Sequence, residues 1–523
     1  MALRPQPKTA AKRNRKNKPA VGTQWRFYVA VSILFSVFSV LVARAAYIQV
    51  ISPERYSSQG DMRSLRSASL SVQRGMIVDR NGRELAVSVP VETVWADPQR
   101  IAEANALSDT RRWQALAETF RMNREELVSK VSDPERRFVY LQRKVTPSEA
   151  DYVRQLNIPG VYLKTESRRY YPTGEISAHL LGLTNIDGQG QEGLELLYDE
   201  HLTGTPGKRV YRKDAQGRVI EEVSQTDAEQ PKQLTLSIDQ RIQATAYTEL
   251  KKAVRYNQAT SGSAVVIDVD TGEILAMVNS PSFNPNNRAD LQSYKMRNRA
   301  ITDSYEPGST VKPLVVLSAL ENRLHKAGDI IDTSPGWLRI GGRRVSDPRN
   351  YGELNLGGIL EHSSNVGVTK IALELGVDPL LQTYFDVGFG NDTGVSLLGE
   401  SMGMFGNRRR WSDFELATLS YGYGLSVTTL QLARAYTAIA SGGMLRPLTI
   451  FRQESPLPAE QVFSPDNTRA VIRMMERVVS EGTAKEAQVP GYRIAGKTGT
   501  TRKATATGGY GDEYVALFAG MAP

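Results

Sequence analysis

The sequence predicts an α+β protein in which one membrane-spanning helix precedes two globular domains. At 523 residues the chain is too long for one ordinary domain. An uncharged run, Phe27 to Ala43, follows a basic tail. Beyond residue 235 come a helix, a hairpin, a helical middle and a late strand, which is typical of an antiparallel sheet flanked by helices. We expect four segments: a basic tail (1–26), a transmembrane helix (27–47), a mixed α/β domain (60–228) and a C-terminal domain (235–523).

Charge and composition exclude several functional classes. Residues 1–26 contain eight cations and no acid, and the remainder of a chain with net charge +9 is close to neutral, so the basic character belongs to a tail and not to a nucleic-acid-binding face. The chain has no cysteine and only four scattered histidines. Disulfides, cysteine nucleophiles, zinc sites and Ser-His-Asp triads are therefore not expected, and we predict no metal and no cofactor.

The apolar run is interpreted as a membrane anchor. The helix can continue past Arg44 through Tyr47 to Val50, which is long enough to span a bilayer. The cations precede the run, so the positive-inside rule predicts a cytoplasmic N-terminus and a periplasmic or extracellular bulk. The alternatives are a cleaved signal peptide ending near Ala43-Arg44-Ala45, which the length of the apolar run disfavours, and a buried core helix, which the flanking charge disfavours.

The segment after the anchor predicts a connector and then a mixed domain. Residues 52–73, with Pro53 and several serines, are typical of a connector. Apolar runs flank Asn81-Gly82, which predicts a hairpin. Residues 102–158 have a helical pattern, and residues 206–233 give strand and turn signals.

The C-terminal domain is predicted to begin with a helix and a hairpin. Residues 239–256 form an amphipathic pattern whose apolar face is Ile242, Ala246 and Leu250. Residues 263–269 and 273–278, joined through Asp270-Thr271-Gly272, predict a hairpin.

The segment Ser309-Thr310-Val311-Lys312 can supply a nucleophile and its base. Pro313 follows the lysine, and a proline is tolerated in the first helical turn, so we expect Ser309 at a helix N-terminus with Lys312 on the same face. A lysine that is desolvated near another cation can have a pKa low enough to accept the serine proton. By itself the Ser-x-x-Lys pattern is weak, because an exposed helix start is the more common explanation for it.

Two later motifs would complete such a site. In Ser363-Ser364-Asn365 the first serine would relay a proton and Asn365 would bind the substrate amide, although such residues also cap helices. Lys497-Thr498-Gly499-Thr500 is expected on a strand where Gly499 lets substrate approach the backbone, with a turn between strands as the alternative. The three motifs follow one another at 54 and 188 residues from Ser309, which indicates a serine acyltransferase.

Together these motifs resemble those of the penicillin-binding protein and serine β-lactamase superfamily. The anchor and the runs Arg74–Gly82 and Arg168–Glu195 are similar to the non-catalytic pedestal, or dimerisation-type domain, of class B penicillin-binding proteins. The stretches Glu306–Pro313 and Tyr421–Thr428 resemble the division-specific transpeptidases of Gram-negative bacteria. The resemblance covers the chain from about residue 25.

The resemblance implies a septal peptidoglycan D,D-transpeptidase of the inner membrane that works through an acyl-serine intermediate. It implies catalytic roles for Ser309 as nucleophile, Lys312 as base, and Ser363 and Lys497 as proton carriers. It implies substrate-binding roles for Asn365, Thr498, Gly499 and Thr500, with an oxyanion hole made by the N–H groups of Ser309 and Thr500. The implied partners are peptidoglycan stem peptides, β-lactam inhibitors, a membrane glycan polymerase and other divisome proteins, with no cofactor and no nucleic acid.

The last residues differ from the family pattern. The sequence ends at Pro523, just past the strand-like segment Tyr514–Gly520, where family members continue with another strand and a C-terminal helix. We therefore expect a transpeptidase domain without its last strand and C-terminal helix. On this ground a non-catalytic divisome scaffold is one alternative. A D,D-carboxypeptidase or a β-lactamase-related acylase is another, because the choice of acyl acceptor leaves no short motif.

Overall fold

The computed structural model describes residues 24–51, 53–70, 72–214, 218–406, 410–505 and 509–522. The chain divides into two compact units, Met1–Ser71 with Pro206–Ala228 and Val72–Thr205 with Glu229–Pro523. Each unit is described by itself below, beginning with the one that contains the apolar helix.

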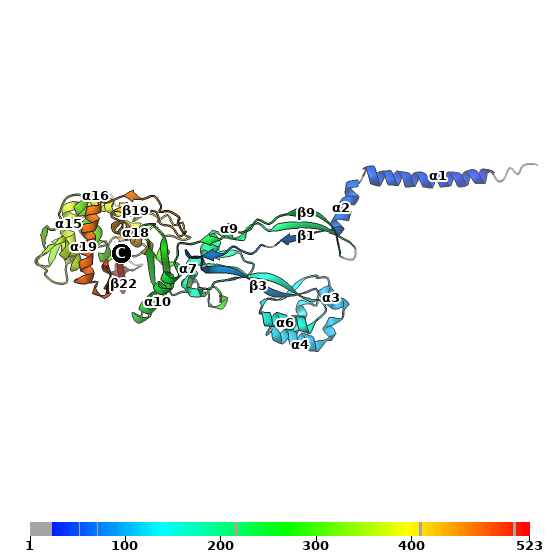
Figure 1. The fold of residues 1–523 in the computed structure, drawn as a ribbon, viewed down its shortest axis with the longest axis horizontal. Coiled ribbons are helices and arrows are strands. Elements are labelled where there is room, and N and C mark those ends of the chain that lie inside the picture. The colour runs from blue at the N-terminus through cyan, green and yellow to red at the C-terminus, as the bar shows by residue number, and fades with distance from the viewer. Residues whose placement is uncertain are drawn as a thin grey trace, which may run out of the picture. The chain divides into compact units, whose positions relative to one another are not determined.

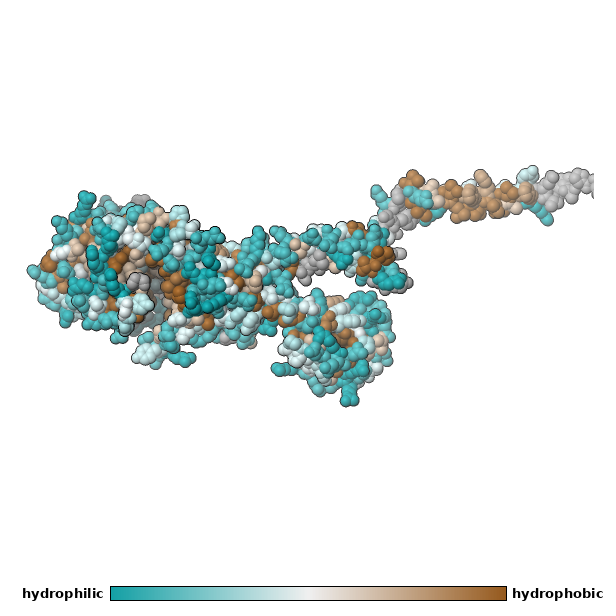
Figure 2. All heavy atoms as spheres, in the orientation of Figure 1, coloured by the Kyte–Doolittle hydropathy of each residue, from teal (hydrophilic) through white to brown (hydrophobic). Residues whose placement is uncertain are grey.

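The first unit contains the predicted membrane helix. Helix α1 (Gln24–Ala46) continues into a π-helical turn (Tyr47–Ile51), and the stretch Trp25–Val50 is long and apolar enough to cross a membrane. Figure 2 shows α1 covered by hydrophobic residues along its length. The cations from Arg4 to Lys18 lie outside the described residues.

The rest of the first unit is a helix and a three-stranded antiparallel sheet. Helix α2 (Pro53–Ser64) leads into β1 (Leu65–Leu70), which pairs with β8 (Gly207–Lys213), and β8 pairs with β9 (Val219–Thr226). The interpretation of 52–73 as a connector was therefore wrong. Strand β1 is stabilised by a partner far away in the sequence, which a local pattern does not reveal.

The second unit begins with a sheet built on one long strand. Strand β2 (Ile77–Val78) and β3 (Glu84–Ala96) form the hairpin predicted at Asn81-Gly82, where Gly82 has φ +81° and the Asp79 carboxylate accepts the Asn81 and Arg83 N–H groups. Strands β4 (Val139–Val145) and β5 (Val161–Tyr170) pair with β3, and β10 (Leu234–Thr235) pairs with β2.

Four helices pack beside the far end of β3 (Figure 1). They are α3 (Pro98–Glu103), α4 (Thr110–Thr119), α5 (Arg124–Lys130) and α6 (Pro147–Leu156), and their core includes Val94, Trp113, Leu116, Leu127 and Val153. The prediction of helices over 102–158 was correct except at 139–145. That segment forms β4, because it pairs with β3 of the same sheet.

Helix α10 (Gln240–Tyr256) lies along the hairpin of β11 (Gly262–Ile267) and β12 (Ile274–Ser280), as predicted. Its fully buried residues are Gln243 and Tyr247, whereas the predicted face of Ile242, Ala246 and Leu250 is only half-buried. Gln243 is buried because its amide exchanges hydrogen bonds with the backbone of Met277, at 2.8 and 2.9 Å.

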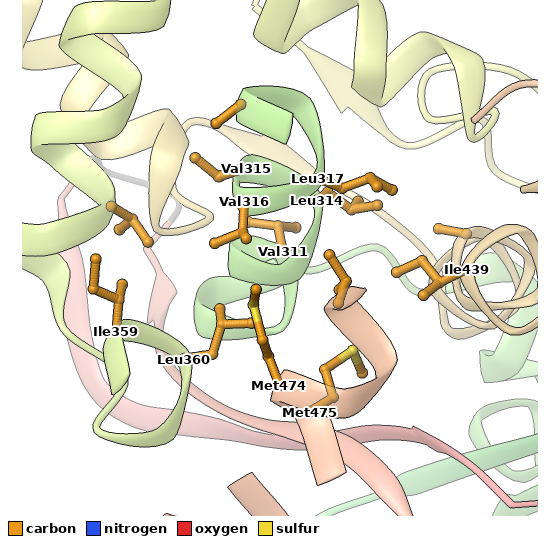
Figure 3. Close-up of a cluster of buried hydrophobic side chains, with 14 of the residues drawn as sticks. Val311, Leu314, Val315, Val316, Leu317, Ile359, Leu360, Ile439, Met474 and Met475 are labelled. Atoms are coloured by element: carbon orange, nitrogen blue, oxygen red, sulfur yellow. The ribbon is translucent and has the colours of Figure 1, made fainter. Parts of the chain in front are cut away.

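The core of the C-terminal half surrounds helix α13 (Lys312–Glu321), in which every residue from Lys312 to Leu320 is buried. Figure 3 shows its side chains meeting Ile359 and Leu360, Ile439, and Met474 and Met475. A helix that is apolar on all sides is stable only inside a core. The surrounding helices are α14 (Leu356–Glu361), α15 (Asn365–Leu375), α16 (Val377–Asp386), α17 (Asp413–Ser420), α18 (Thr429–Ala440) and α19 (Pro465–Ser480).

The last two strands, β21 (Ala495–Ala504) and β22 (Tyr510–Met521), form an antiparallel pair against α19. Within the described residues this pair and the β11–β12 hairpin are separate two-stranded sheets. Two smaller antiparallel pairs lie near the site: β13 (Ile330–Asp332) with β16 (Glu353–Asn355), and between them in the sequence the hairpin of β14 (Trp337–Ile340) and β15 (Arg343–Ser346).

The remaining elements are short. They are η2 (Ala106–Ser108), η3 (Gly174–Ile176), α7 (Ala178–Leu181), β6 (Leu183–Thr184), β7 (Gly190–Glu192), α8 (Gly193–Leu197), α9 (Asp199–Thr203), η4 (Arg288–Asp290), α11 (Ser293–Met296), α12 (Arg299–Thr302), η5 (Gly308–Val311), β17 (Met404–Phe405), β18 (Leu425–Ser426), β19 (Met444–Leu445), β20 (Glu460–Gln461) and η6 (Lys485–Ala487).

Candidate active site

Ser309 lies in a tight turn that leads directly into the buried helix α13. The turn is η5 (Gly308–Val311), a 3₁₀ helix, so the expected position at a helix start is confirmed. Gly308 has φ +55°, and a Cβ there would lie 2.4 Å from the Thr501 methyl group. Its N–H donates to the Gly422 carbonyl at 3.0 Å. Residues 308–311, called the nucleophile turn below after the role predicted for Ser309, are thus held between β21 and the 421–424 loop. The Ser309 N–H is one of the first amides of a helix, which lack helical partners.

Lys312 is completely buried one turn after Ser309. Its Nζ donates to the Ser363 carbonyl at 2.6 Å, to Ser363 Oγ at 3.1 Å and to Asn365 Oδ1 at 2.7 Å. Burial in the core holds the pKa of Lys312 well below its usual range, and the nearby Lys497 cation lowers it further, while Asp347 opposes the shift. The structure therefore unites the first two motifs around a lysine whose pKa is lowered.

The Ser363-Ser364-Asn365 segment forms the turn between α14 and α15. Ser363 has φ +55°, a left-handed conformation that is uncommon for a residue with a side chain. Both its carbonyl and its hydroxyl accept hydrogen bonds from Lys312. Ser364 is the N-cap of α15, and its Oγ accepts the Gly367 N–H at 2.8 Å. Ser364 thus caps the helix, whereas Ser363 contacts Lys312.

Asp347 is a site residue that the sequence analysis missed. Its carboxylate accepts hydrogen bonds from Ser364 Oγ at 2.5 Å, from the Asn365 N–H at 2.5 Å and from the Val366 N–H at 3.0 Å. It therefore places a negative charge at the N-terminus of α15, where the helix dipole favours one. Asp347 precedes Ser363 by 16 residues in a polar loop, and no local pattern marks it.

The third motif lies on β21, as predicted. Lys497 is fully buried, and desolvation lowers its pKa to about 8. Its Nζ donates to the Thr498 carbonyl at 3.1 Å. The Thr498 hydroxyl is 3.1 Å from Thr483 Oγ1, and Thr500 is exposed.

Gly499 has a packing role beside the one predicted from the sequence. A Cβ on Gly499 would lie 3.0 Å from Thr310 Cγ2 and 3.1 Å from the Pro307 carbonyl oxygen. The absence of a side chain thus lets β21 approach the nucleophile turn. Access of substrate to this strand stays a prediction.

The rim beside Ser309 contains a second missed residue, Glu306. Its Oε1 accepts the Gly424 N–H at 2.8 Å and the Tyr510 hydroxyl at 3.1 Å. Burial raises the pKa of this carboxyl above its usual range. Tyr510 packs edge-on against Tyr423, with ring centroids 5.5 Å apart. Polar and aromatic groups therefore fix the segment that leads into the nucleophile turn.

The predicted site residues thus come together to different degrees. Hydrogen bonds join Lys312, Ser363 and Asn365 directly. Lys497 acts on Lys312 through its charge, and its strand touches the nucleophile turn. In the part of the chain that the structure describes, no hydrogen bond joins Ser309 Oγ to Lys312 or Lys497 to Ser363. The arrangement offers a hydroxyl, an amine whose pKa is lowered well below its usual range and a second amine of pKa about 8.

Comparison with known proteins identifies the family. Residues 262–523 match the family model "Penicillin binding protein transpeptidase domain", and residues 69–236 match "Penicillin-binding Protein dimerisation domain". The chain is 48% identical over 514 residues to "Peptidoglycan D,D-transpeptidase FtsI" of Escherichia coli K12, covering 98% of this chain and 87% of that protein.

Solved structures agree with this assignment. A peptidoglycan synthetase from Bifidobacterium adolescentis matches with a TM-score of 0.68 and 28% identity, covering 88% of this chain and 90% of that one. Penicillin binding protein 3 of Mycobacterium tuberculosis, complexed with ampicillin, matches with a TM-score of 0.66 and 27% identity, covering 87% of each chain. The chain therefore belongs to the penicillin-binding protein transpeptidase family, as a class B member of the division-specific type.

Proposed function

We propose that Ser309 is the nucleophile of a septal peptidoglycan D,D-transpeptidase, the activity for which the Escherichia coli relative is named. The observation that supports this assignment most is the burial of Lys312 one turn after Ser309, with its amine directed to Ser363 and Asn365. A wholly buried lysine without a contacting carboxylate destabilises a fold, so a catalytic role gives its position a reason.

In the acylation step, Ser309 Oγ attacks the carbonyl carbon of the penultimate D-alanine while its proton passes to Lys312. The lowered pKa of Lys312 supports its role as base, because its neutral form can accept a proton. The proton then reaches the nitrogen of the leaving D-alanine through Ser363 and Lys497. The C–N bond breaks, D-alanine departs, and an acyl-serine ester remains.

In the second step an amine from a neighbouring stem peptide attacks the ester. Its nitrogen forms the new peptide bond, its proton leaves through the same groups, and the Ser309 hydroxyl is restored. Lys497, with a pKa of about 8, keeps most of its positive charge at neutral pH. A cation at this position stabilises the terminal carboxylate of the donor, which Thr498 and Thr500 would hold.

Backbone groups supply the remaining stabilisation. The N–H groups of Ser309 and Thr500 would form the oxyanion hole, and the position of Ser309 at a helix start leaves its N–H available. Asn365 would orient the substrate amide with the part of its side chain that does not bind Lys312. The close approach of β21 to the nucleophile turn at Gly499 supports an oxyanion hole shared between these two elements.

The same proposal covers location and partners. The helix Trp25–Val50 fits a single-pass inner membrane protein, and the basic residues before it favour a cytoplasmic N-terminus with a periplasmic bulk. Residues 60–228 would form the pedestal and 235–523 the transpeptidase domain; the family matches at 69–236 and 262–523 support this division of the chain. β-Lactams would acylate Ser309, and a membrane glycan polymerase and other divisome proteins would be its partners.

Covalent labelling with a fluorescent penicillin tests this function. The full-length protein in membranes should become stably labelled, and a Ser309→Ala variant should not. A Ser480→Ala variant, which removes an exposed hydroxyl at the end of α19, should still be labelled. If the folded wild-type protein remains unlabelled, the enzyme assignment is wrong and the non-catalytic scaffold becomes the better interpretation.

A further inference from the structure

The β14–β15 hairpin has one buried face and one exposed cationic face. Ile340 and Val345 pack beneath it against Ala417, with exposures of 8% and 4%. The other face carries Arg339 and Arg344, both exposed. Burial of the apolar inner face explains why the hairpin folds. Folding does not explain why two arginines lie on the outer face.

The two arginines are directly opposite each other across the hairpin. The strand register pairs Arg339 with Arg344, and like charges in this position are destabilising. Neither guanidinium has an ion pair or a hydrogen-bond acceptor among the described residues; Arg344 lies over the Trp337 ring at 4.9 Å. The contact with Trp337 offsets part of this repulsion for Arg344, but no negative charge among the described residues offsets it, and a local cost of this kind is expected at functional sites.

The hairpin is attached to the catalytic motif at its last residues. The Ser346 carbonyl accepts a hydrogen bond from Asn365 Nδ2 at 3.3 Å, and Asp347 accepts the Asn365 N–H. Arg344 is two residues before Ser346 on the same face of β15, which is about 7 Å along a strand. An extended peptide advances about 3.3–3.6 Å per residue. A substrate bound at Asn365 therefore has its neighbouring residue within reach of the arginines.

We propose that Arg339 and Arg344 together bind a carboxylate on the donor stem peptide, carried by the residue that precedes its two terminal D-alanines. This proposal rests on the proposed transpeptidase function and specifies its substrate. Guanidinium groups bind carboxylates through paired, charge-assisted hydrogen bonds, and one carboxylate between two guanidinium groups removes their repulsion. The terminal carboxylate of the donor is assigned to β21, so this pair selects a second acidic group.

The test uses the full-length protein in detergent with two synthetic donors. Each is a peptidyl-D-alanyl-thioglycolate, in which the thioester replaces the last peptide bond and thioglycolate supplies the terminal carboxylate. One donor has a carboxylate on the residue before D-alanine, and the other has a carboxamide there. Release of thiol gives kcat/KM. The wild type should prefer the carboxylate donor by about tenfold to a hundredfold, the range expected for hydrogen bonds to charged groups.

Variants separate recognition from folding. The double variant Arg339→Gln with Arg344→Gln should abolish the preference. The double variant Arg339→Lys with Arg344→Lys should retain part of it, because lysine keeps the positive charge but lacks the paired N–H donors of a guanidinium group. Arg473→Gln removes an exposed arginine of α19 and should keep the full preference. The glutamine pair should be labelled by penicillin at the wild-type rate and should melt at the same or a higher temperature, because repulsion is removed.

Three results would overturn the proposal: a wild type without preference, a glutamine pair that keeps it, or a glutamine pair that loses thermal stability together with penicillin labelling, which would show a structural role. Failure of the proposed function itself looks different. In that case the wild type would not be labelled by penicillin at all, and both the transpeptidase function and the donor-binding role of the arginines would be wrong.

Discussion

Two parts of the second unit bury positive charges, and they surround them in opposite ways. Near β3, Arg74 and Arg169 have side chains only 7% and 3% exposed, and each donates to the Glu195 carboxylate at 2.6 Å. Asp199 accepts a further hydrogen bond from Arg74, also at 2.6 Å. Every buried cation of this cluster has a carboxylate partner.

In the active site, Lys312 and Lys497 are both completely buried, and within the described residues neither contacts a carboxylate. Lys312 instead donates to neutral oxygen atoms of Ser363 and Asn365. Removing a charge from water costs several kcal/mol unless a partner compensates it. The arginines therefore have carboxylate partners, whereas burial without such a partner lowers the pKa of both lysines, as the proposed proton transfer requires.

Replacing the base should have the largest effect on activity. Lys312→Met should lower the rate constant for penicillin acylation by about 10²–10⁴-fold, because proton transfer by a positioned group contributes that much. The melting temperature should change little, since the neutral side chain suits a buried site. The time course of fluorescent labelling measures the rate, with the surface variant Lys252→Met as the control. If Lys312→Met is acylated at the wild-type rate, Lys312 is not the base, and its burial has another cause.

Breaking the paired cluster should affect stability and leave the chemistry unchanged. Glu195→Ala leaves two buried guanidinium groups without their shared partner, which should cost about 3–5 kcal/mol. Thermal melting should show a clear loss, whereas Glu192→Ala, at an exposed neighbouring position, should not. Below the melting transition, labelling of Ser309 should proceed at the wild-type rate. A stable Glu195→Ala protein would contradict a structural role for the cluster.

Asp347 is the carboxylate whose charge acts on buried Lys312 without contacting it, and it opposes the lowering of the Lys312 pKa. Asp347→Asn should reduce acylation by about 10–100-fold, since the turn that positions Ser363 and Asn365 loosens. Losing the negative charge also disfavours protonated Lys312, so its pKa falls further. The acid limb of the pH–rate profile should therefore move to lower pH. If Asp347→Asn is slower but its acid limb does not move, Asp347 positions the turn and does not influence the pKa of Lys312.

Lys497→Arg should have the smallest effect. In the wild type, deprotonation of Lys497 near pH 8 should reduce acylation at higher pH, because the cation that favours the substrate carboxylate is lost. Arginine remains charged throughout this range, so the alkaline limb should move upward while the maximum rate falls severalfold. The pH dependence of labelling in both proteins measures this. If the alkaline limb of Lys497→Arg lies at the same pH as in the wild type, the titration of another group causes it.

The sequence was sufficient for the parts of the site that depend on local geometry. Pro313 predicted a helix starting near Ser309, and the structure confirms this start. The anchor helix and the hairpin at Asn81-Gly82 also follow from local patterns, and the structure confirms both.

Long-range contacts account for what the sequence could not predict. Asp347 belongs to the site only because its loop folds onto the N-terminus of α15. Strand β4 was interpreted as part of a helical region, because its pairing with β3 involves residues about 50 positions away. Gly499 looked like a point of substrate access, and its packing against Thr310 required the tertiary structure.

The pH dependence of acylation by penicillin, measured from about pH 5 to about pH 10, tests most directly whether Lys312 is a buried base that favours its neutral form. This role predicts that the acid limb of the profile, where Lys312 becomes protonated, lies far below pH 10.5, the usual pKa of lysine, whereas the alkaline limb is assigned to Lys497. A rate that still rises through pH 10 would show that Lys312 keeps an ordinary pKa, and it would contradict the interpretation of its burial.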